Sequence, residues 1–190
     1  MTAQELRHPP GRYRLRVGDY AMLDATGAFD GARTELIEGD VIVMSPQYRP
    51  HGIAKLGLYN ALRSSLQALR SPLTAVVEFS LALDEHNLPE PDIMLTSEPI
   101  GEGAVPLASV ALVIEVADTT LDTDLGAKAR LYSAAGVREY WVADINGGVI
   151  HQMWAPNAET YGKCRKIAFG ETVAAATIDR LSIVTARLRP

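Results

Sequence analysis

The sequence predicts an α/β fold in which a mixed β-sheet is flanked by helices. Two segments place apolar residues at helical spacing, and one strand candidate is apolar on both faces. The order along the chain is a hairpin, a helix, three strands, a second helix, another strand and closing antiparallel strands. We expect one domain over residues 1–190, with a core at about 34–145 and C-terminal strands over 149–190.

The first part of the chain predicts a short helix, a hairpin and a long helix. Residues 17–25 predict the short helix. A Gly39-Asp40 turn between two β-prone runs predicts a hairpin over residues 35–44. Residues 51–70 carry apolar side chains at helical spacing, and Ser71-Pro72 ends that helix because the residue before a proline disfavours helical backbone.

The middle of the chain predicts the centre of the sheet. Three strand candidates follow the long helix, at residues 74–83, 91–96 and 110–117. The third is apolar on both faces apart from Glu115, which is typical of a strand covered on both sides. Residues 121–135 predict a helix, started by Thr120 or Asp122 as a cap and ended by Gly136.

The last part of the chain predicts antiparallel additions to the sheet. The strand candidates are residues 139–143, 149–154, 161–169 and 181–188. Asn146-Gly147-Gly148 supplies a tight turn between the first two.

Composition excludes several classes of protein. The chain has 190 residues, of which 47% are hydrophobic and 22% charged, as in an ordinary globular domain. The single cysteine, Cys164, leaves no intramolecular disulfide and no zinc cluster. Residues 1–10 lack the apolar core of a signal peptide, and the apolar runs are strand-sized, so we expect a cytoplasmic protein without a membrane span. No glycine-rich loop follows a predicted strand, which argues against a nucleotide cofactor.

The net charge of −5 argues against a protein that coats duplex nucleic acid, because phosphate binding relies on Lys and Arg. A local basic rim remains compatible with that charge. Its candidates are Arg49, Lys55, Arg63 and Arg70 on the long helix, and Lys163, Arg165 and Lys166 near the end. The competing interpretation, which we favour, is that these are solvated faces.

Three charged residues lie where the sequence is otherwise apolar. Asp92 opens the run 91–95, Glu115 lies inside 110–117, and Lys128 falls on the apolar stripe of its helix. A buried charge is costly unless it is paired, so the three predict either a structural ion pair or an active site over one sheet. Two carboxylates suit Mg²⁺, with Mn²⁺ as a substitute. Such an ion with a nearby ammonium fits hydrolysis of a phosphodiester.

A set of motifs extends this pattern over most of the chain. They are Glu35-Leu36-Ile37-Glu38-Gly39, Met44-Ser45-Pro46 with His51, Pro91-Asp92, Val113-Ile114-Glu115-Val116, Asp124 with Lys128 and Tyr132, and residues 136–144. Together they resemble the Uma-type putative restriction endonuclease family of the PD-(D/E)XK nuclease superfamily. The resemblance implies a restriction-endonuclease-like fold and a metal-dependent nuclease acting on DNA. It also implies that Asp92 and Glu115 bind the metal and that Glu35 is a further catalytic acid.

The chain departs from the superfamily pattern at one position. That pattern places a lysine two residues after Glu115, where this chain has Ala117. The resemblance implies that Lys128 takes the catalytic role from the following helix. The position of Lys128 on the apolar stripe independently aims it inward.

Two functions follow from these patterns. The first is a Mg²⁺-dependent DNA nuclease, for which a homodimer is compatible because two-fold symmetry suits cutting of both strands. The second is an inactive member of the same fold that acts as a binding or assembly module, which Ala117 and the acidic net charge favour. Of three secondary candidates, we expect His51 to be a cap or surface residue and Asp118 a helix cap, and we leave Glu78 open between site and solvent.

Overall fold

The computed structural model describes residues 11–186 and residue 188, so the predictions for residues 1–10 lie outside the described residues. The first half contains α1 (Val17–Ala25), β1 (Thr34–Ile37), β2 (Asp40–Val43), α2 (Arg49–Leu69), β3 (Thr74–Val77), β4 (Leu81–Ala82), β5 (Ile93–Thr96) and β6 (Val105–Pro106). The second half contains a short 3₁₀ helix (Leu107–Ser109), β7 (Val110–Ala117), α3 (Leu121–Thr123), a π-helical segment (Asp124–Lys128), α4 (Ala129–Ala135), β8 (Glu139–Asp144), β9 (Val149–Pro156), β10 (Tyr161–Ala168), β11 (Thr172–Ala174) and β12 (Ser182–Val184).

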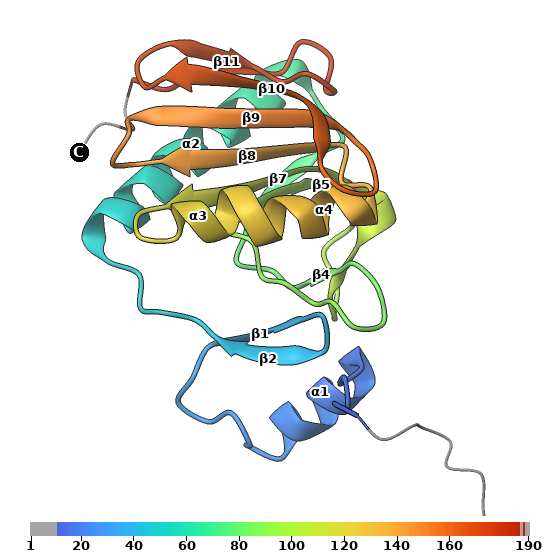
Figure 1. Cartoon of the computed structure of the whole chain (residues 1–190). Helices are drawn as coiled ribbons and strands as arrows, with labels where there is room; N and C mark the ends of the chain where they lie inside the picture. Colours follow the sequence, from blue (N-terminus) through green and yellow to red (C-terminus); the bar gives the residue numbers. More distant parts are fainter. Residues whose placement is uncertain (1–10, 187, 189–190) are drawn as a thin grey trace, which may run out of the picture.

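The main sheet has six strands in the order β10-β9-β8-β7-β5-β3 (Figure 1). Only β7 and β8 pair in parallel among these strands, and the other neighbours pair antiparallel. The predicted mixed sheet is therefore confirmed. The strand pairs β1-β2, β4-β6 and β11-β12 form separate small sheets.

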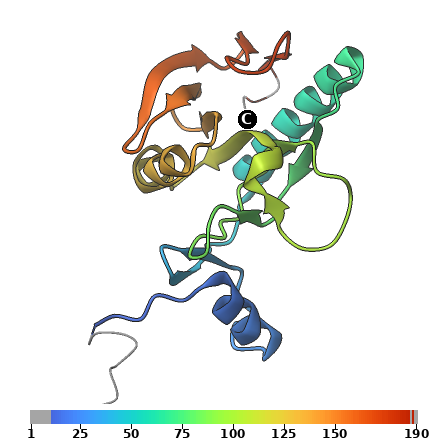
Figure 2. The same cartoon turned by 90° about the vertical axis from the view of Figure 1, so that its right-hand side faces the viewer.

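Helices cover both faces of this sheet. In Figure 2, α2 lies on one side of the strands and α3 with α4 on the other. One apolar cluster joins Ile114 and Val116 of β7 to Leu58 of α2. The other joins Ala117 of β7 to Tyr132 of α4. Because alternate residues of β7 enter opposite clusters, this strand is buried on both faces, as its sequence predicts.

Several element bounds match the predictions, and others correct them. The bounds of α1 and β7 are those predicted, and Gly136 ends α4 with a φ of 85°. Residues 74–83 do not form one strand, because Glu78 has a left-handed φ of 57° that separates β3 from β4. The closing strand is shorter than predicted, and β6 and β11 were not predicted.

No helix in the described part of the chain is both long enough and apolar enough to cross a bilayer.

Candidate active site

The sheet register brings Asp92 and Glu115 together. The β5–β7 pairing places Ile93 opposite Ile114, so the next residues outward are Asp92 and Glu115. The amide of Asp92 donates to Glu115 Oε2 at 3.3 Å, and the amide of Val116 donates to Asp92 Oδ2 at 2.9 Å. Both residues are buried, with 7% and 4% of their surface exposed. Adjacent strands therefore hold two carboxylates side by side.

Lys128 points toward these acids, as the sequence predicts. Its Nζ lies 3.0 Å from Glu115 Oε1 and 3.5 Å from Glu35 Oε1. The lysine is the last residue of the π-helical segment, whose i→i+5 hydrogen bonding is rare and often marks functional sites. The ammonium therefore reaches the sheet from the helix that follows β7.

Glu35 reaches the same place from the hairpin β1–β2. It is buried and accepts a hydrogen bond from the amide of Glu90 at 3.2 Å. Arg33 of the neighbouring chain segment forms ion pairs with Glu90 at 2.6 Å and with Glu78 at 3.1 Å. These contacts fasten the hairpin to the sheet beside Lys128.

Asp124 and Tyr132, from the helical segment that follows β7, complete this side of the site. The Tyr132 hydroxyl donates to Glu115 Oε1 at 2.9 Å, and the Thr120 hydroxyl donates to Asp124 Oδ2 at 2.6 Å. Asp124 and Tyr132 lie four residues before and after Lys128, a spacing that keeps all three near one side of a helix. That spacing is the sequence signal by which they could have been assigned to the site.

The first turns of α2 hold Asp92 from another direction. His51 Nε2 lies 3.1 Å from Asp92 Oδ2, and Lys55 Nζ lies 3.5 Å from Asp92 Oδ1. Lys55 also contacts Glu78 Oε1 and Gln47 Oε1, each at 2.5 Å. The prediction of a surface or capping His51 is wrong, because His51 is 8% exposed. The favoured interpretation of Lys55 as part of a solvated face is also wrong, since its side chain is only 13% exposed.

The remaining candidates lie at the edge of the site. Glu78 is half-buried and pairs with Lys55 and Arg33, so it joins the site indirectly. Asp118 does not cap the helix, because Thr120 occupies the N-cap position of α3. Its backbone oxygen instead accepts a hydrogen bond from Asn146 Nδ2 at 2.6 Å.

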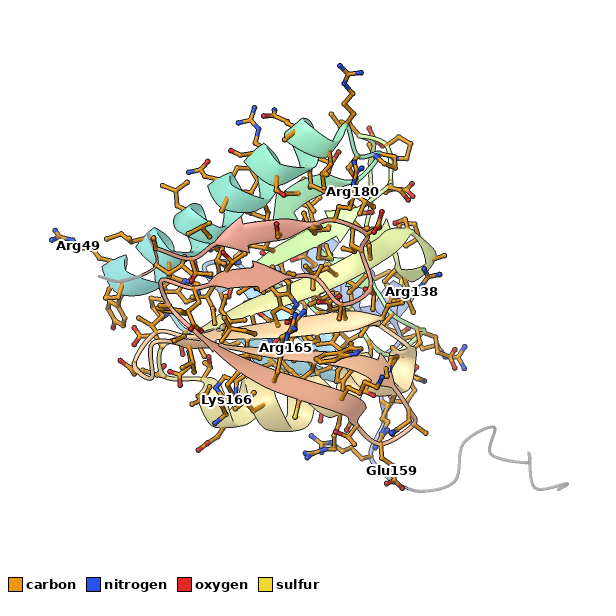
Figure 3. All side chains as sticks on the ribbon, turned by 90° about the horizontal axis from the view of Figure 1, so that it is seen from above. Arg49, Arg138, Glu159, Arg165, Lys166 and Arg180 are labelled. Carbon is orange, nitrogen blue, oxygen red and sulfur yellow. The ribbon has the colours of Figure 1, made fainter. Side chains whose placement is uncertain are left out.

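Most of the predicted basic rim does not face this site. Arg49 extends outward from the start of α2 (Figure 3). Arg165 stabilises the C-terminal strands, since its guanidinium donates to Gln152 and to the Ala174 carbonyl, each at 2.6 Å, and lies 5.6 Å from the centre of the Trp154 ring.

Burial and the neighbouring charged groups shift the pKa values of Asp92 and Glu115 in opposite directions. Burial raises the pKa of Glu115 to about 8, Lys128 lowers it in part, and Asp92, Asp124 and Glu35 raise it further. Burial alone would raise the pKa of Asp92, but the hydrogen bond and charge of His51, the Val116 amide and Lys55 lower it below its usual value. Burial would lower the pKa of Lys128, but Glu115, Glu35 and Asp124 raise it, so this lysine stays protonated.

The donor set fits a divalent cation. Asp92, Glu115, Glu35 and Asp124 all line one cavity of about 400 Å³. Burial is the main cause that raises the pKa values of Glu115 and Asp124, and the neighbouring carboxylates raise them further while Lys128 lowers them in part. Within residues 11–186 and 188, no three His, Cys, Asp or Glu side chains already form a ligand shell. The two adjacent carboxylates of Asp92 and Glu115 suit an ion such as Mg²⁺, which takes few protein ligands and keeps several waters.

The chain is similar to one known protein family and to a solved structure. Residues 18–183 match a family model described as "Uma2: Putative restriction endonuclease". A crystal structure of "a putative nuclease belonging to DUF820 from Anabaena variabilis ATCC 29413" superimposes with a TM-score of 0.70 at 16% sequence identity. The match covers 92% of this chain and 97% of that one, and it shows that the two share a fold. No curated protein matches the chain.

Proposed function

The chain belongs to the Uma2 family, and from that membership we propose that it is a metal-dependent nuclease that hydrolyses phosphodiester bonds of DNA. The observation that carries the proposal is the convergence of Asp92, Glu115 and Lys128 in one cavity. Three separate segments supply them, and each is held by hydrogen bonds from neighbouring groups. The proposed unit is a single restriction-endonuclease-like domain over residues 1–190.

In this proposal, Asp92 and Glu115 hold Mg²⁺ or Mn²⁺. A divalent ion bound there supplies polarisation of a phosphoryl oxygen and activation of water. Asp92 is ionised across the neutral range, because its pKa is lowered. The paired backbone contacts of Asp92 and Glu115 fix the separation of the two carboxylates before any ion binds.

Lys128 supplies a fixed positive charge beside the reacting phosphate. Its ammonium remains protonated because three carboxylates raise its pKa. Such a charge stabilises the negative charge that develops on phosphate and orients the attacking water. Glu35 supports it as a further acid, since it contacts Nζ on the side of the hairpin.

Cleavage of supercoiled plasmid tests the proposal. With Mn²⁺ or Mg²⁺, we expect the wild-type protein to nick or linearise the plasmid and Lys128→Ala to lose that activity. The matched control is Lys163→Ala, which removes an exposed lysine of β10 outside the cavity lining. A wild-type protein that cuts no form of DNA with either ion at any pH would refute it.

A second candidate is an inactive nuclease fold that serves as a binding or assembly module. The specific observation in its favour is that the buried charges already satisfy one another: Lys128 pairs with Glu115, and Lys55 pairs with Asp92. Removing one partner of a buried pair then costs about 3–5 kcal/mol. Thermal unfolding of Glu115→Gln separates the candidates, because only a structural network requires early melting of this variant.

Two further expectations accompany the proposed nuclease. A homodimer would place two such sites against the two strands of a duplex. A cytoplasmic location would give access to DNA. Sedimentation analysis of the purified chain tests the first, and localisation of a tagged chain tests the second.

A further inference from the structure

The cavity that holds the carboxylates has one apolar wall. This wall consists of Ile42, Val43, Met44, Pro46 and Tyr48, which follow one another along β2 and the segment leading into α2. Three of these side chains are large and exposed, with 42% of Ile42, 67% of Val43 and 69% of Tyr48 accessible. An exposed apolar surface joined to a polar cavity is typical of a ligand-binding site.

The hairpin register explains why Ile42, at the start of this wall, faces the acids. Glu35 pairs directly with Ile42 across β1 and β2, so their side chains lie on the same face of the hairpin. Glu35 contacts Lys128, which fixes that face toward the cavity. Met44 lies two residues beyond Ile42, and its amide donates to the Arg33 carbonyl at 2.8 Å, which continues the pairing past β2.

The charges of the lining oppose the binding of a nucleic acid along its phosphates. The described lining includes the carboxylates of Glu35, Glu90, Asp92, Glu115, Asp118 and Asp124, and its basic side chains are His51 and Lys128. Lys128 is already engaged with two of these acids. Tracking of a phosphate backbone, in a duplex or in a single strand, relies on a series of Lys and Arg contacts that this lining does not provide, so contacts to the bases would have to contribute most of the binding.

Nucleobases make a different demand on a binding site. Each base presents a flat face that stacks on aromatic and apolar side chains whatever the sequence, but only an unpaired base exposes that face. The apolar wall supplies such a surface next to the carboxylates. Resting on the proposed nuclease function, we propose that the wall binds an unpaired base beside the cleaved phosphate, so that the substrate class is single-stranded or locally unpaired DNA.

Fluorescence anisotropy with the Glu115→Gln variant tests this proposal without cleavage. The probes are a labelled single strand of about 12 nucleotides and a hairpin duplex that contains the same sequence. We expect the single strand to bind at least about tenfold more tightly than the duplex, and Tyr48→Ala to weaken its binding by about 5- to 150-fold, the usual range for loss of one stacked base.

Two further variants serve as controls. Tyr48→Phe keeps the ring and should bind the single strand within about twofold of the parent. Phe79→Ala removes another exposed aromatic side chain, 51% accessible and outside the cavity lining, and should have no effect.

Equal or tighter binding of the duplex would overturn the inference, as would Tyr48→Ala binding like the parent or absence of binding to either probe. These failures are distinct from failure of the proposed nuclease, which is judged by cleavage with the wild-type protein. A nuclease that cuts DNA but prefers the duplex would leave the proposed function intact.

Discussion

Metal binding at the site should release a proton from Glu115. Metal ligands must be deprotonated, whereas burial raises the pKa of this carboxyl to about 8 in the metal-free protein. Glu115 is therefore mostly protonated at pH 7 in the metal-free protein. Binding of one Mn²⁺ should release most of one proton at pH 7 and progressively less as the pH rises past about 8. Asp92 contributes little to this count, because its pKa is lowered.

The same ionisation sets the apparent metal affinity. The ionised fraction of Glu115 rises with pH up to about 8, so the apparent affinity should rise by at most about tenfold per pH unit below that pH and level off above it. Calorimetric titration of Mn²⁺ in buffers of low and high ionisation enthalpy measures both the protons released and the affinity.

Two variants control this measurement. Glu115→Gln should bind Mn²⁺ weakly and release no proton, whereas Glu159→Gln removes an exposed carboxylate outside the cavity lining and should behave as the wild type. A wild-type protein that binds Mn²⁺ with less than about 0.2 proton released at pH 7 would refute the account of Glu115 given above.

The remaining predictions concern stability and cleavage. In the metal-free protein, the raised pKa of Glu115 gives stability that is full below about pH 4.5 and is lost as pH rises through about 8, so the melting temperature should fall over that interval in scanning calorimetry. Glu115→Gln should keep or raise the melting temperature at pH 8, because glutamine resembles the protonated form; melting several degrees early would favour the inactive module. Tyr132→Phe removes a fully buried donor to Glu115 and should cost about 1–3 kcal/mol in urea unfolding, with Mn²⁺ still bound. Glu139→Ala should lower the free energy of unfolding by at least about 3 kcal/mol without changing the Mn²⁺ affinity. The fully buried Glu139 carboxylate accepts hydrogen bonds from the Trp141 indole and from the backbone amides of Ala176 and Thr177. An unchanged midpoint of urea unfolding would contradict this prediction.

The parts of the fold that follow from local pattern were predictable from the sequence. The strand at 110–117 was predictable because burial on both faces leaves an unbroken apolar run, which Glu115 alone interrupts. The end of α4 was predictable because Gly136 accepts a left-handed backbone at low cost. The break at Glu78 was not, because a left-handed glutamate follows from its tertiary setting, where Lys55 and Arg33 hold its carboxylate.

The residues of the candidate site also differ in whether the sequence alone could identify them. Asp92, Glu115 and Lys128 were identified because each charge lies in an apolar run of its own segment. His51 and Lys55 were misjudged because their role depends on how α2 crosses the sheet. A signal was nevertheless present, since His51, Ala54, Leu58 and Leu62 form the buried stripe of α2, and a histidine on that stripe faces the sheet.

The structure also gives a physical reason for the unusual position of the lysine. Ala117 is fully buried and packs in the same cluster as Ala129 and Tyr132, so the helix that follows β7 closes over its side chain. A lysine at residue 117 would share the face of Glu115, because the two are two residues apart on one strand, but it would have to displace that helix. Lys128 instead reaches Glu115 from the helix itself, where Tyr132 donates to the same carboxylate oxygen. The position of the Lys128 ammonium therefore depends on how the helix packs against the sheet. A search for a lysine on β7 itself would overlook this site, although a lysine and the two carboxylates lie together in it.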